Sequence, residues 1–241
     1  MEKIIYDVGA NNGDDIPYYL MKCDKVVAVE ANPEQCEQIN QRFSQEIKDG
    51  RLFVENYVIT DRENMGEVDY YKHVQPHLHI CNQFPTPSPD IMDHFIKVRL
   101  QSESITNIIN KHGHPYYIKL DVNENYETTL LKKLFSVGIR PQYVSAESHN
   151  IDVFYTLVKD GRYDLFKLVD GPTISELYKD HSVSTCKNTI EKYSFPHHSA
   201  GPFGNDINGD WINMHDFFDI LIEVGMGWKD IHATNSQYLN K

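Results

Sequence analysis

Basic residues are scarce in this chain. Its 241 residues include 23 Lys and Arg against 35 Asp and Glu, which gives a formal net charge of −12. The Lys and Arg residues form no cluster, whereas a protein that binds duplex nucleic acid needs clustered cations to contact the phosphates. We therefore expect no nucleic-acid partner. The charge still allows an acidic protein that binds one small molecule through a few local donors.

Long apolar runs and targeting signals are also lacking. No stretch approaches the ~18 apolar residues of a membrane-spanning helix. The first residues, MEKIIYDVGANNGDD, carry acids early and lack the apolar core of a signal peptide. The four cysteines are scattered without a C-x-x-C pair, which argues against a zinc finger or a disulfide scaffold and favours reduced thiols. We expect a cytoplasmic protein with no membrane partner.

No internal repeat or low-complexity tract appears, but short apolar runs alternate with amphipathic stretches. This alternation is typical of β-α-β units, and the length fits a single domain over residues 1–241. Residues 68–72 are expected to form a hairpin with the strand before them, through a turn at residues 64–66. The expected strands are residues 4–8, 26–30, 52–54, 58–60, 68–72, 96–100, 116–122, 142–147 and 165–169, and the expected helices are residues 18–20, 33–47, 104–111, 127–137, 151–160 and 214–224.

Two segments lack this regularity. Residues 73–95 contain four prolines, three early histidines and no clean periodicity, so we expect an irregular insertion that leaves the sheet and lies over the site. Residues 171–213 include the Gly-, Pro- and His-rich stretch FPHHSAGPFGNDINGDW. We interpret them as a lid, a substrate loop region or the last sheet elements, within the same domain.

The first expected strand ends in a glycine-rich turn, DVGANNGDD, which begins at Asp7. Glycines let the backbone turn sharply and approach a ligand, and the next helix offers free N–H groups. Gly9 and Gly13 give G-x-x-x-G, which fits the dinucleotide pattern G-x-G-x-x-G poorly. Glu30 ends the second expected strand, where an acid can accept both hydroxyls of a ribose. Together the turn and the acid predict a nucleotide-like cofactor.

A second polar group follows the strands at residues 116–122 and 142–147. Asp121, Glu147 and His149 all fall near the carboxyl ends of these strands, so they meet at one edge of the sheet if the strands are neighbours. Two carboxylates and an imidazole suit Mg, Mn or Fe(II). They equally suit acid–base catalysis without a metal. A third interpretation is that Glu147 is simply paired and His149 caps the next helix.

The remaining candidates are weaker. His197 and His198, followed by Gly-Pro-Phe203-Gly, are typical of a lid or substrate loop. The early histidines of residues 73–95 are better explained by a solvated loop.

These motifs together resemble class I S-adenosylmethionine-dependent methyltransferases, and among them the FkbM family. DVGANNGDD is similar to that family's first glycine motif, VVAVEANP to its ribose-binding acid motif and YIKLDVNENYETTLL to its IKxDVEGxExxxL segment. GPFGNDINGDW and WKDIHA are similar to its C-terminal segments. The chain departs from the family at residues 123–125, which read Asn-Glu-Asn where Glu-Gly is common.

The resemblance implies a Rossmann-like α/β fold with a mostly parallel seven-stranded sheet, helices on both faces and strand order 3-2-1-4-5-7-6, strand seven being antiparallel. It also implies that S-adenosylmethionine is the cofactor. Asp7, Gly9, Asn11 and Gly13 would line its methionine end, Glu30 would hold the ribose, and Thr60 and Asp61 would lie near the adenine. The other expected cofactor-binding residues are Ala10, Ala31 and Asp121.

By the same resemblance the activity is O-methylation of a sugar or nucleotide sugar, such as a polysaccharide building block. Asp121, Glu147 and His149 would be catalytic, either through a divalent metal that binds the acceptor hydroxyl or with His149 as general base. His197, His198 and Phe203 would contact the substrate.

Two other functions remain open at this point. One is an NAD(P)-dependent Rossmann oxidoreductase, and the other is a non-catalytic binding protein that keeps the methyltransferase fold. The apolar residues 214–224 also suggest a surface for a homodimer.

Overall fold

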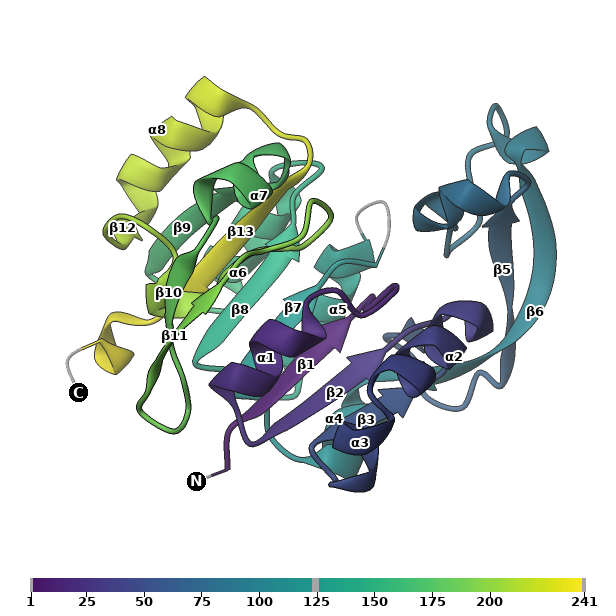
Figure 1. Cartoon of the computed structure of the whole chain (residues 1–241). Helices are drawn as coiled ribbons and strands as arrows, with labels where there is room; N and C mark the ends of the chain where they lie inside the picture. Colours follow the sequence, from purple (N-terminus) through teal and green to yellow (C-terminus); the bar gives the residue numbers. More distant parts are fainter. Residues whose placement is uncertain (1, 123–125, 240–241) are drawn as a thin grey trace.

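The computed structural model describes residues 2–122 and 126–239. Its centre is an eight-stranded sheet of order β12-β9-β13-β8-β7-β1-β2-β3 (Figure 1). Strands β3, β2, β1, β7 and β8 are parallel, and β13 runs antiparallel between β8 and β9. The strands are β1 (Ile4–Val8), β2 (Lys25–Val29), β3 (Leu52–Glu55), β7 (Tyr117–Leu120), β8 (Tyr143–Glu147), β9 (Leu165–Asp170), β12 (Ile212–Asn213) and β13 (Lys229–Thr234).

The sequence prediction of the fold is confirmed, with one difference in strand count. When β12 is left out and the other seven strands are numbered in chain order, they follow 3-2-1-4-5-7-6 with the seventh antiparallel, as expected. The eighth strand is β12, two residues long, which pairs antiparallel with β9 at the edge. So short a strand carries no periodicity of its own, and pairing with β9 alone defines it.

Helices cover both faces of this sheet, which is why its parallel strands are almost entirely apolar. One face packs against α1 (Ile16–Lys22), α2 (Pro33–Arg42), α3 (Ser44–Lys48) and α7 (Ile174–Leu177). The other packs against α4 (Ile105–His112), α5 (Tyr126–Ser136), α6 (Asp152–Lys159) and α8 (Met214–Val224).

Local chemistry sets several of these helix ends. The Asn32 side chain accepts a hydrogen bond from the Glu34 N–H, and Pro33 occupies the first helical position, where no N–H is needed. The single helix expected over residues 33–47 is wrong. Phe43 leaves the helical conformation (φ −116°, ψ 30°) and buries its ring in the core, which divides the segment into α2 and α3.

A second sheet of three strands, β4-β6-β5, stands beside the main one at the right of Figure 1. It contains β4 (Val58–Thr60), β5 (Glu67–His73) and β6 (Phe95–Ser104). The hairpin expected between residues 58–60 and 68–72 is wrong, because β5 pairs antiparallel with β6 along its whole length and β4 pairs parallel with β6. The long β6 offers seven antiparallel partners to β5, which the three residues of β4 cannot match.

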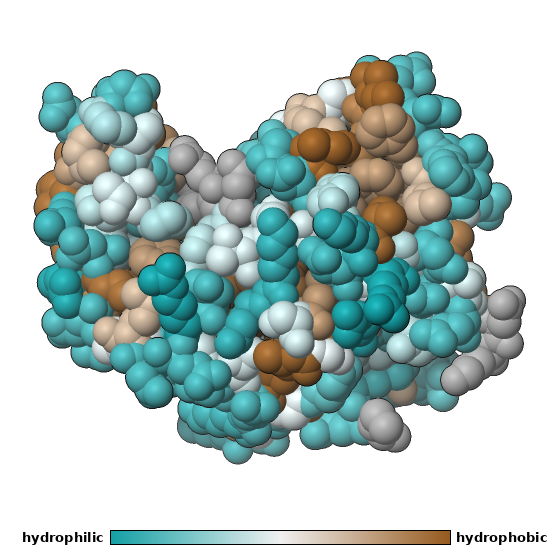
Figure 2. Space-filling model, turned by 180° about the vertical axis from the view of Figure 1, so that it is seen from behind, coloured by the Kyte–Doolittle hydropathy of each residue, from teal (hydrophilic) through white to brown (hydrophobic). Residues whose placement is uncertain are grey.

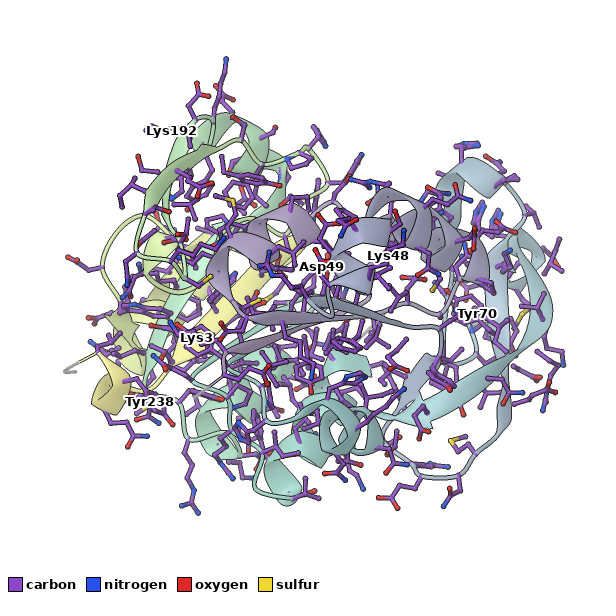
Figure 3. The ribbon with its side chains drawn as sticks, turned by 60° about the horizontal axis from the view of Figure 1, so that its bottom comes forward. Lys3, Lys48, Asp49, Tyr70, Lys192 and Tyr238 are labelled. Atoms are coloured by element: carbon purple, nitrogen blue, oxygen red, sulfur yellow. The ribbon has the colours of Figure 1, made fainter. Side chains whose placement is uncertain are left out.

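Residues 73–95 contain two short 3-10 helices, η1 (Pro76–Cys81) and η2 (Met92–His94). Gln83, which lies between these two helices, exchanges two backbone hydrogen bonds of 2.8 and 3.0 Å with Tyr71 of β5. These bonds return residues 82–84 to the side of β5. Tyr70, the residue before that bridge, lies between β5 and the main body of the molecule (Figure 3).

Residues 171–213 fold against the main sheet on the side of α1. They contain η3 (Gly171–Thr173), α7, a hairpin of β10 (His181–Ser184) and β11 (Ile190–Tyr193), and η4 (Gly204–Asp206). The Tyr18 ring of α1 meets Phe195 and Phe203 edge-on, and its hydroxyl donates to Asp206 at 2.8 Å. Most of the segment is therefore a layer on one face of the sheet.

Among the described residues, no helix is long and apolar enough to cross a membrane. Apolar surface gathers over α8, at the upper right of Figure 2, where Phe218, Ile222 and Val224 are exposed. The homodimer expected through this helix stays a prediction.

The α5 core contact allows a direct test of this packing. Leu131 is fully buried between α5 and the sheet, whereas its neighbour Lys132 is exposed. Leu131→Ala should lower the free energy of unfolding by about 2–5 kcal/mol, because it leaves a cavity in the core. Lys132→Ala, the matched control, should change it by less than about 0.5 kcal/mol. Urea denaturation followed by circular dichroism measures both; equal effects would contradict the packing.

Candidate functional site

A cavity of about 520 Å³ opens at the carboxyl ends of β1, β2, β7 and β8. Seen from behind, the molecule shows a hollow between its two lobes at the upper edge (Figure 2). Ligands of open α/β sheets bind at this edge, where the strand order reverses. The residues predicted from sequence that line the cavity are Gly9, Ala10, Asn11, Glu30, Ala31, Asp121, Glu147, His149 and His198.

The glycine turn brings the end of β1 against the end of β7. Gly9 has φ +86°, and a Cβ at this position would lie 1.7 Å from the Asp121 carbonyl oxygen. Its N–H and that of Ala10 both donate to the Val29 carbonyl, at 2.9 and 3.1 Å. Gly13 has φ +78° and contacts Ile16 and other core side chains instead of the cavity. We expected Gly13 at the cofactor, but its position is structural.

Glu30 connects the first two turns of the site. One carboxylate oxygen accepts from the Asn11 N–H at 2.8 Å and the other from the Asn32 N–H at 2.7 Å. Burial raises its pKa, and these two donors oppose that rise. Each carboxylate oxygen has a further lone pair, so Glu30 can accept ligand hydroxyls while it holds both loops.

Beneath the cavity lies a buried lysine that the sequence prediction did not assign to the site. The Lys119 ammonium is 3.3 Å from Asp7, 3.6 Å from Asp15 and 3.2 Å from Asp121. Asp7 is completely buried and does not line the cavity. Its neighbour across the β1–β7 pair is Lys119, and the ion pair holds it there. A contact between Asp7 and the cofactor stays a prediction.

Burial and mutual repulsion shift the pKa values of this cluster. Burial, opposed by Lys119, raises the pKa of Asp7 to about 6 and also raises that of Asp15. Burial disfavours the Lys119 cation too, but the three carboxylates outweigh it and raise its pKa above the ordinary value. Burial, with the Asp121 and Glu147 charges, raises the pKa of the nearby Asp230 well above its usual range. Lys119 is thus a permanent cation among groups that gain protons easily.

Glu147 and His149 form the other wall of the cavity. Their side chains are 3.3 Å apart, and the hydrogen bond to Glu147 raises the pKa of His149 to about 8. The imidazole is consequently protonated at neutral pH. Nearby on β13, burial lowers the pKa of His232 to about 3, so that imidazole is neutral.

The predicted metal site does not fit the described residues. Within residues 2–122 and 126–239, no group of three or more His, Cys, Asp or Glu side chains is arranged to hold a metal ion. Asp121 pairs with Lys119, and Glu147 pairs with His149. The residues that converge at the sheet edge form two separate ion pairs.

Several other predicted residues lie outside the cavity. Thr60 is buried and donates to the Arg62 carbonyl at 2.8 Å, while Asp61 accepts from the Tyr126 hydroxyl at 2.8 Å. The Phe203 ring is buried and stacks on Tyr117 in the core, with centroids 4.1 Å apart, so its predicted contact with the substrate stays a prediction. His197 is exposed and does not line the cavity. The departure from the family pattern at residues 123–125 lies outside the described residues.

The cavity also has walls that the sequence prediction did not assign to the site. They come from residues 57–59, from β5, from residues 73–95, from the start of α5 and from the turn before β13, and include Tyr57, Val58, Ile59, Tyr70, His79, Asn82, Gln83, Phe84, Tyr126 and Trp228. The expected position of residues 73–95 over the site was the one available signal. The other residues meet only through long-range strand pairing.

The sequence was compared with protein families and with curated proteins. Residues 7–167, more than half of the chain, match the sequence model of the Methyltransferase FkbM domain. A search of curated proteins finds no match.

Solved structures give low-identity similarities. Methyltransferase FkbM from Methylobacillus flagellatus aligns at 16% identity and a TM-score of 0.46, over 70% of this chain and 40% of that one. Precorrin-6y C5,15-methyltransferase from Geobacter metallireducens aligns at 9% identity and a TM-score of 0.42, over 98% and 81% of the two chains. A SAM-dependent O-methyltransferase from Thermotoga maritima aligns at 8% identity and 0.41, over 97% and 59%. This chain therefore spans well under two thirds of the length of the first of these proteins.

The Lys119 cluster predicts a pH-dependent cost of removing its cation. Lys119→Met should destabilise the protein by about 3–5 kcal/mol at pH 8, because buried carboxylates are left unpaired. The cost should be smaller at pH 5, below the pKa of about 6 of Asp7, where that carboxyl is protonated in the folded protein.

Urea denaturation at both pH values measures this effect. Lys97→Met is the control, since its ion pair with Asp69 is exposed and worth at most about 1 kcal/mol. An equal cost of Lys119→Met at pH 5 and pH 8 would argue against the charge cluster.

Proposed function

Because the chain belongs to the FkbM methyltransferase domain family, we propose that it is an S-adenosylmethionine-dependent O-methyltransferase that acts on a sugar hydroxyl. The observation that carries the proposal is the single cavity that joins Glu30 at the end of β2 to the Glu147–His149 pair at the end of β8. Such a cavity brings a bound nucleoside and a second substrate together.

The residues present fit the cofactor. Glu30 supplies carboxylate oxygens at the strand end where a ribose is held in nucleotide-binding α/β folds. Beside it, Val58, Ile59 and Phe84 give apolar walls suited to a flat base, and the turn at Gly9–Asn11 leads toward Asp121. The methionine end of the cofactor would then extend toward Asp121 and Lys119.

The acceptor then lies at the Glu147–His149 end. When bound, S-adenosylmethionine would supply a methyl group from its cationic sulfonium to the acceptor oxygen, and the electron pair of the broken carbon–sulfur bond would stay on sulfur as a neutral thioether. The protein must align the hydroxyl and take its proton. His149 is the base in this proposal, and Glu147 orients its ring. After the imidazolium of His149 has lost a proton, the neutral imidazole takes the proton of the acceptor hydroxyl.

Glu30 provides the test of cofactor binding. Glu30→Gln should weaken S-adenosylmethionine binding about 10- to 100-fold, because a charge-assisted hydrogen bond to the ribose is lost. Glu34→Gln is the matched control, since that side chain is 71% exposed and contacts Lys72 instead of the cavity.

Isothermal titration calorimetry with S-adenosylmethionine, its demethylated product and NADH measures these affinities. Tight binding of NADH and none of either methionine derivative would overturn the methyltransferase proposal in favour of an oxidoreductase. Equal affinities in Glu30→Gln and wild type would remove Glu30 from the cofactor site.

The pKa of His149 sets the expected pH dependence. Because this pKa is raised to about 8, the imidazole is a base only above that pH, and the rate of methyl transfer should rise through pH 8 and then level. His149→Gln should lower the rate by about 10²–10⁴-fold and abolish this inflection. Glu147→Gln should move the inflection to lower pH, toward the ordinary value of 6.5.

Single-turnover measurements with bound cofactor check this prediction. If His149→Gln keeps the wild-type pH profile, His149 is not the base.

A further inference from the structure

Two aromatic rings line the acceptor end of the cavity. Trp228 is half-buried and His198 is exposed, and both belong to the cavity wall beside Glu147 and His149. Their ring planes are 23° apart with centroids 6.0 Å apart, so they present nearly parallel surfaces. The family match at residues 7–167 covers neither ring.

The indole of Trp228 packs closely against the backbone of Gly171. A Cβ on Gly171 would lie 2.4–2.5 Å from three atoms of the indole, so the ring rests directly on the backbone of Gly171. The Gly171 N–H also donates to the Trp228 carbonyl at 3.0 Å. Only a glycine leaves space for the indole in this position.

The turn that carries Trp228, at the start of β13, is also hydrogen-bonded to the segment of Glu147 and His149. The Ser148 N–H donates to the Lys229 carbonyl at 2.8 Å, and the Gly227 N–H donates to the Ser148 carbonyl at 3.3 Å. Ser148 lies between Glu147 and His149 in the chain. The indole therefore keeps a set position relative to the two groups that handle the acceptor hydroxyl.

His198 is anchored from the cofactor side. The next residue, Ser199, donates its hydroxyl to Asp15, and the Ala200 N–H donates to the second Asp15 oxygen at 3.1 Å. Asp15 is in turn 3.6 Å from Lys119. The aromatic pair is thus supported by both walls of the cavity.

The charges beside these rings select among ring-shaped ligands. Asp121 and Glu147 give this end of the cavity acceptor oxygens, which suit hydroxyl donors. The two cations of the lining, Lys119 and protonated His149, already face carboxylates. A phosphate or carboxylate on the ligand would approach Asp121 and Glu147 and be repelled.

Resting on the proposed function, we propose that Trp228 and His198 form an acceptor platform for the ring of an uncharged sugar. The C–H bonds on one face of a pyranose carry partial positive charge and stack on the negative face of the indole. The hydroxyls on the edge of the ring then reach Asp121, Glu147 and His149. A free glycoside fits this platform better than a sugar phosphate or a nucleotide sugar.

The first experiment detects binding without turnover. The chain has two tryptophans, and Trp211 stacks on Tyr143 away from the cavity. Trp211→Phe therefore leaves Trp228 as the only tryptophan, whose fluorescence is excited at the red edge of absorption to avoid the tyrosines. This variant is titrated with methyl α-glucopyranoside, methyl α-galactopyranoside and methyl α-mannopyranoside, with and without S-adenosylhomocysteine. Glucose 1-phosphate and UDP-glucose are the charged counterparts.

We expect a saturable change of Trp228 emission with at least one glycoside at up to tens of millimolar, and at least about tenfold weaker binding of the charged forms. If no glycoside changes the emission, or if the charged forms bind as tightly, the platform proposal is overturned. Cofactor affinity is measured separately by calorimetry. Glycoside binding without cofactor binding would support the platform and reject the methyltransferase proposal. Cofactor binding without glycoside binding would support the methyltransferase proposal and reject the platform.

The second experiment uses variants of the platform, with the glycoside from the first as acceptor. Trp228→Ala should raise the KM for the acceptor about 10- to 100-fold, with the Kd for S-adenosylmethionine unchanged. Trp228→Phe should restore part of the affinity because it keeps an aromatic face. Gly171→Ala should also raise KM by displacing the indole, and Trp211→Phe should leave KM unchanged. A fall in kcat or in cofactor affinity without a change in KM would contradict the platform, and thermal melts identify any variant that fails to fold.

Discussion

The site depends on one buried cation, Lys119. Its ammonium lies within 3.6 Å of carboxylates from three separate segments: Asp7 in β1, Asp15 just before α1 and Asp121 just after β7. In a low-dielectric interior, carboxylates this close together are stable only with a cation among them. The arrangement therefore brings together the floor of the cavity, the glycine turn and the carboxyl end of β7. Through Asp15 it also positions residues 199–200, and with them the loop that carries His198.

The central sheet was predictable because its strands are buried on both faces. A strand such as β1, all of whose residues are buried, reads as an apolar run whatever its partners are. The second sheet was not predictable in the same way. Its strand β6 is partly exposed, and its pairing with β5 joins residues 22 to 34 positions apart in sequence, with ion pairs such as Lys97–Asp69 across the strands. The local sequence pattern therefore indicated the strands of the second sheet but not which of these strands pair with each other.

Some residues of the candidate site could likewise be predicted from the sequence, and others could not. Glu30, Asp121, Glu147 and His149 could be placed because polar residues at the ends of parallel strands meet at one edge. Asp7 and Phe203 carry side chains suited to binding a ligand, yet both are buried. The burial of Asp7 depends on the register of β1 with β7, and that of Phe203 on how residues 171–213 pack against the sheet. Trp228 begins the segment WKDIHA, but its sequence did not indicate a place in the site. That place comes from the antiparallel pairing of β13 with β8.

The two ends of the cavity are consequently built from different parts of the chain. The proposed cofactor end uses the first turns of the sheet and residues 57–59, all within the stretch that matches the family model. The proposed acceptor end adds His198 and Trp228, which lie beyond that stretch. A methyl donor common to a family needs one conserved geometry, whereas acceptors differ in shape and hydrogen bonding. Antiparallel β13 joins the two ends: it completes the sheet and, through Ser148, holds the aromatic wall beside Glu147 and His149. In the proposed mechanism, β13 thereby also sets which acceptor can approach His149.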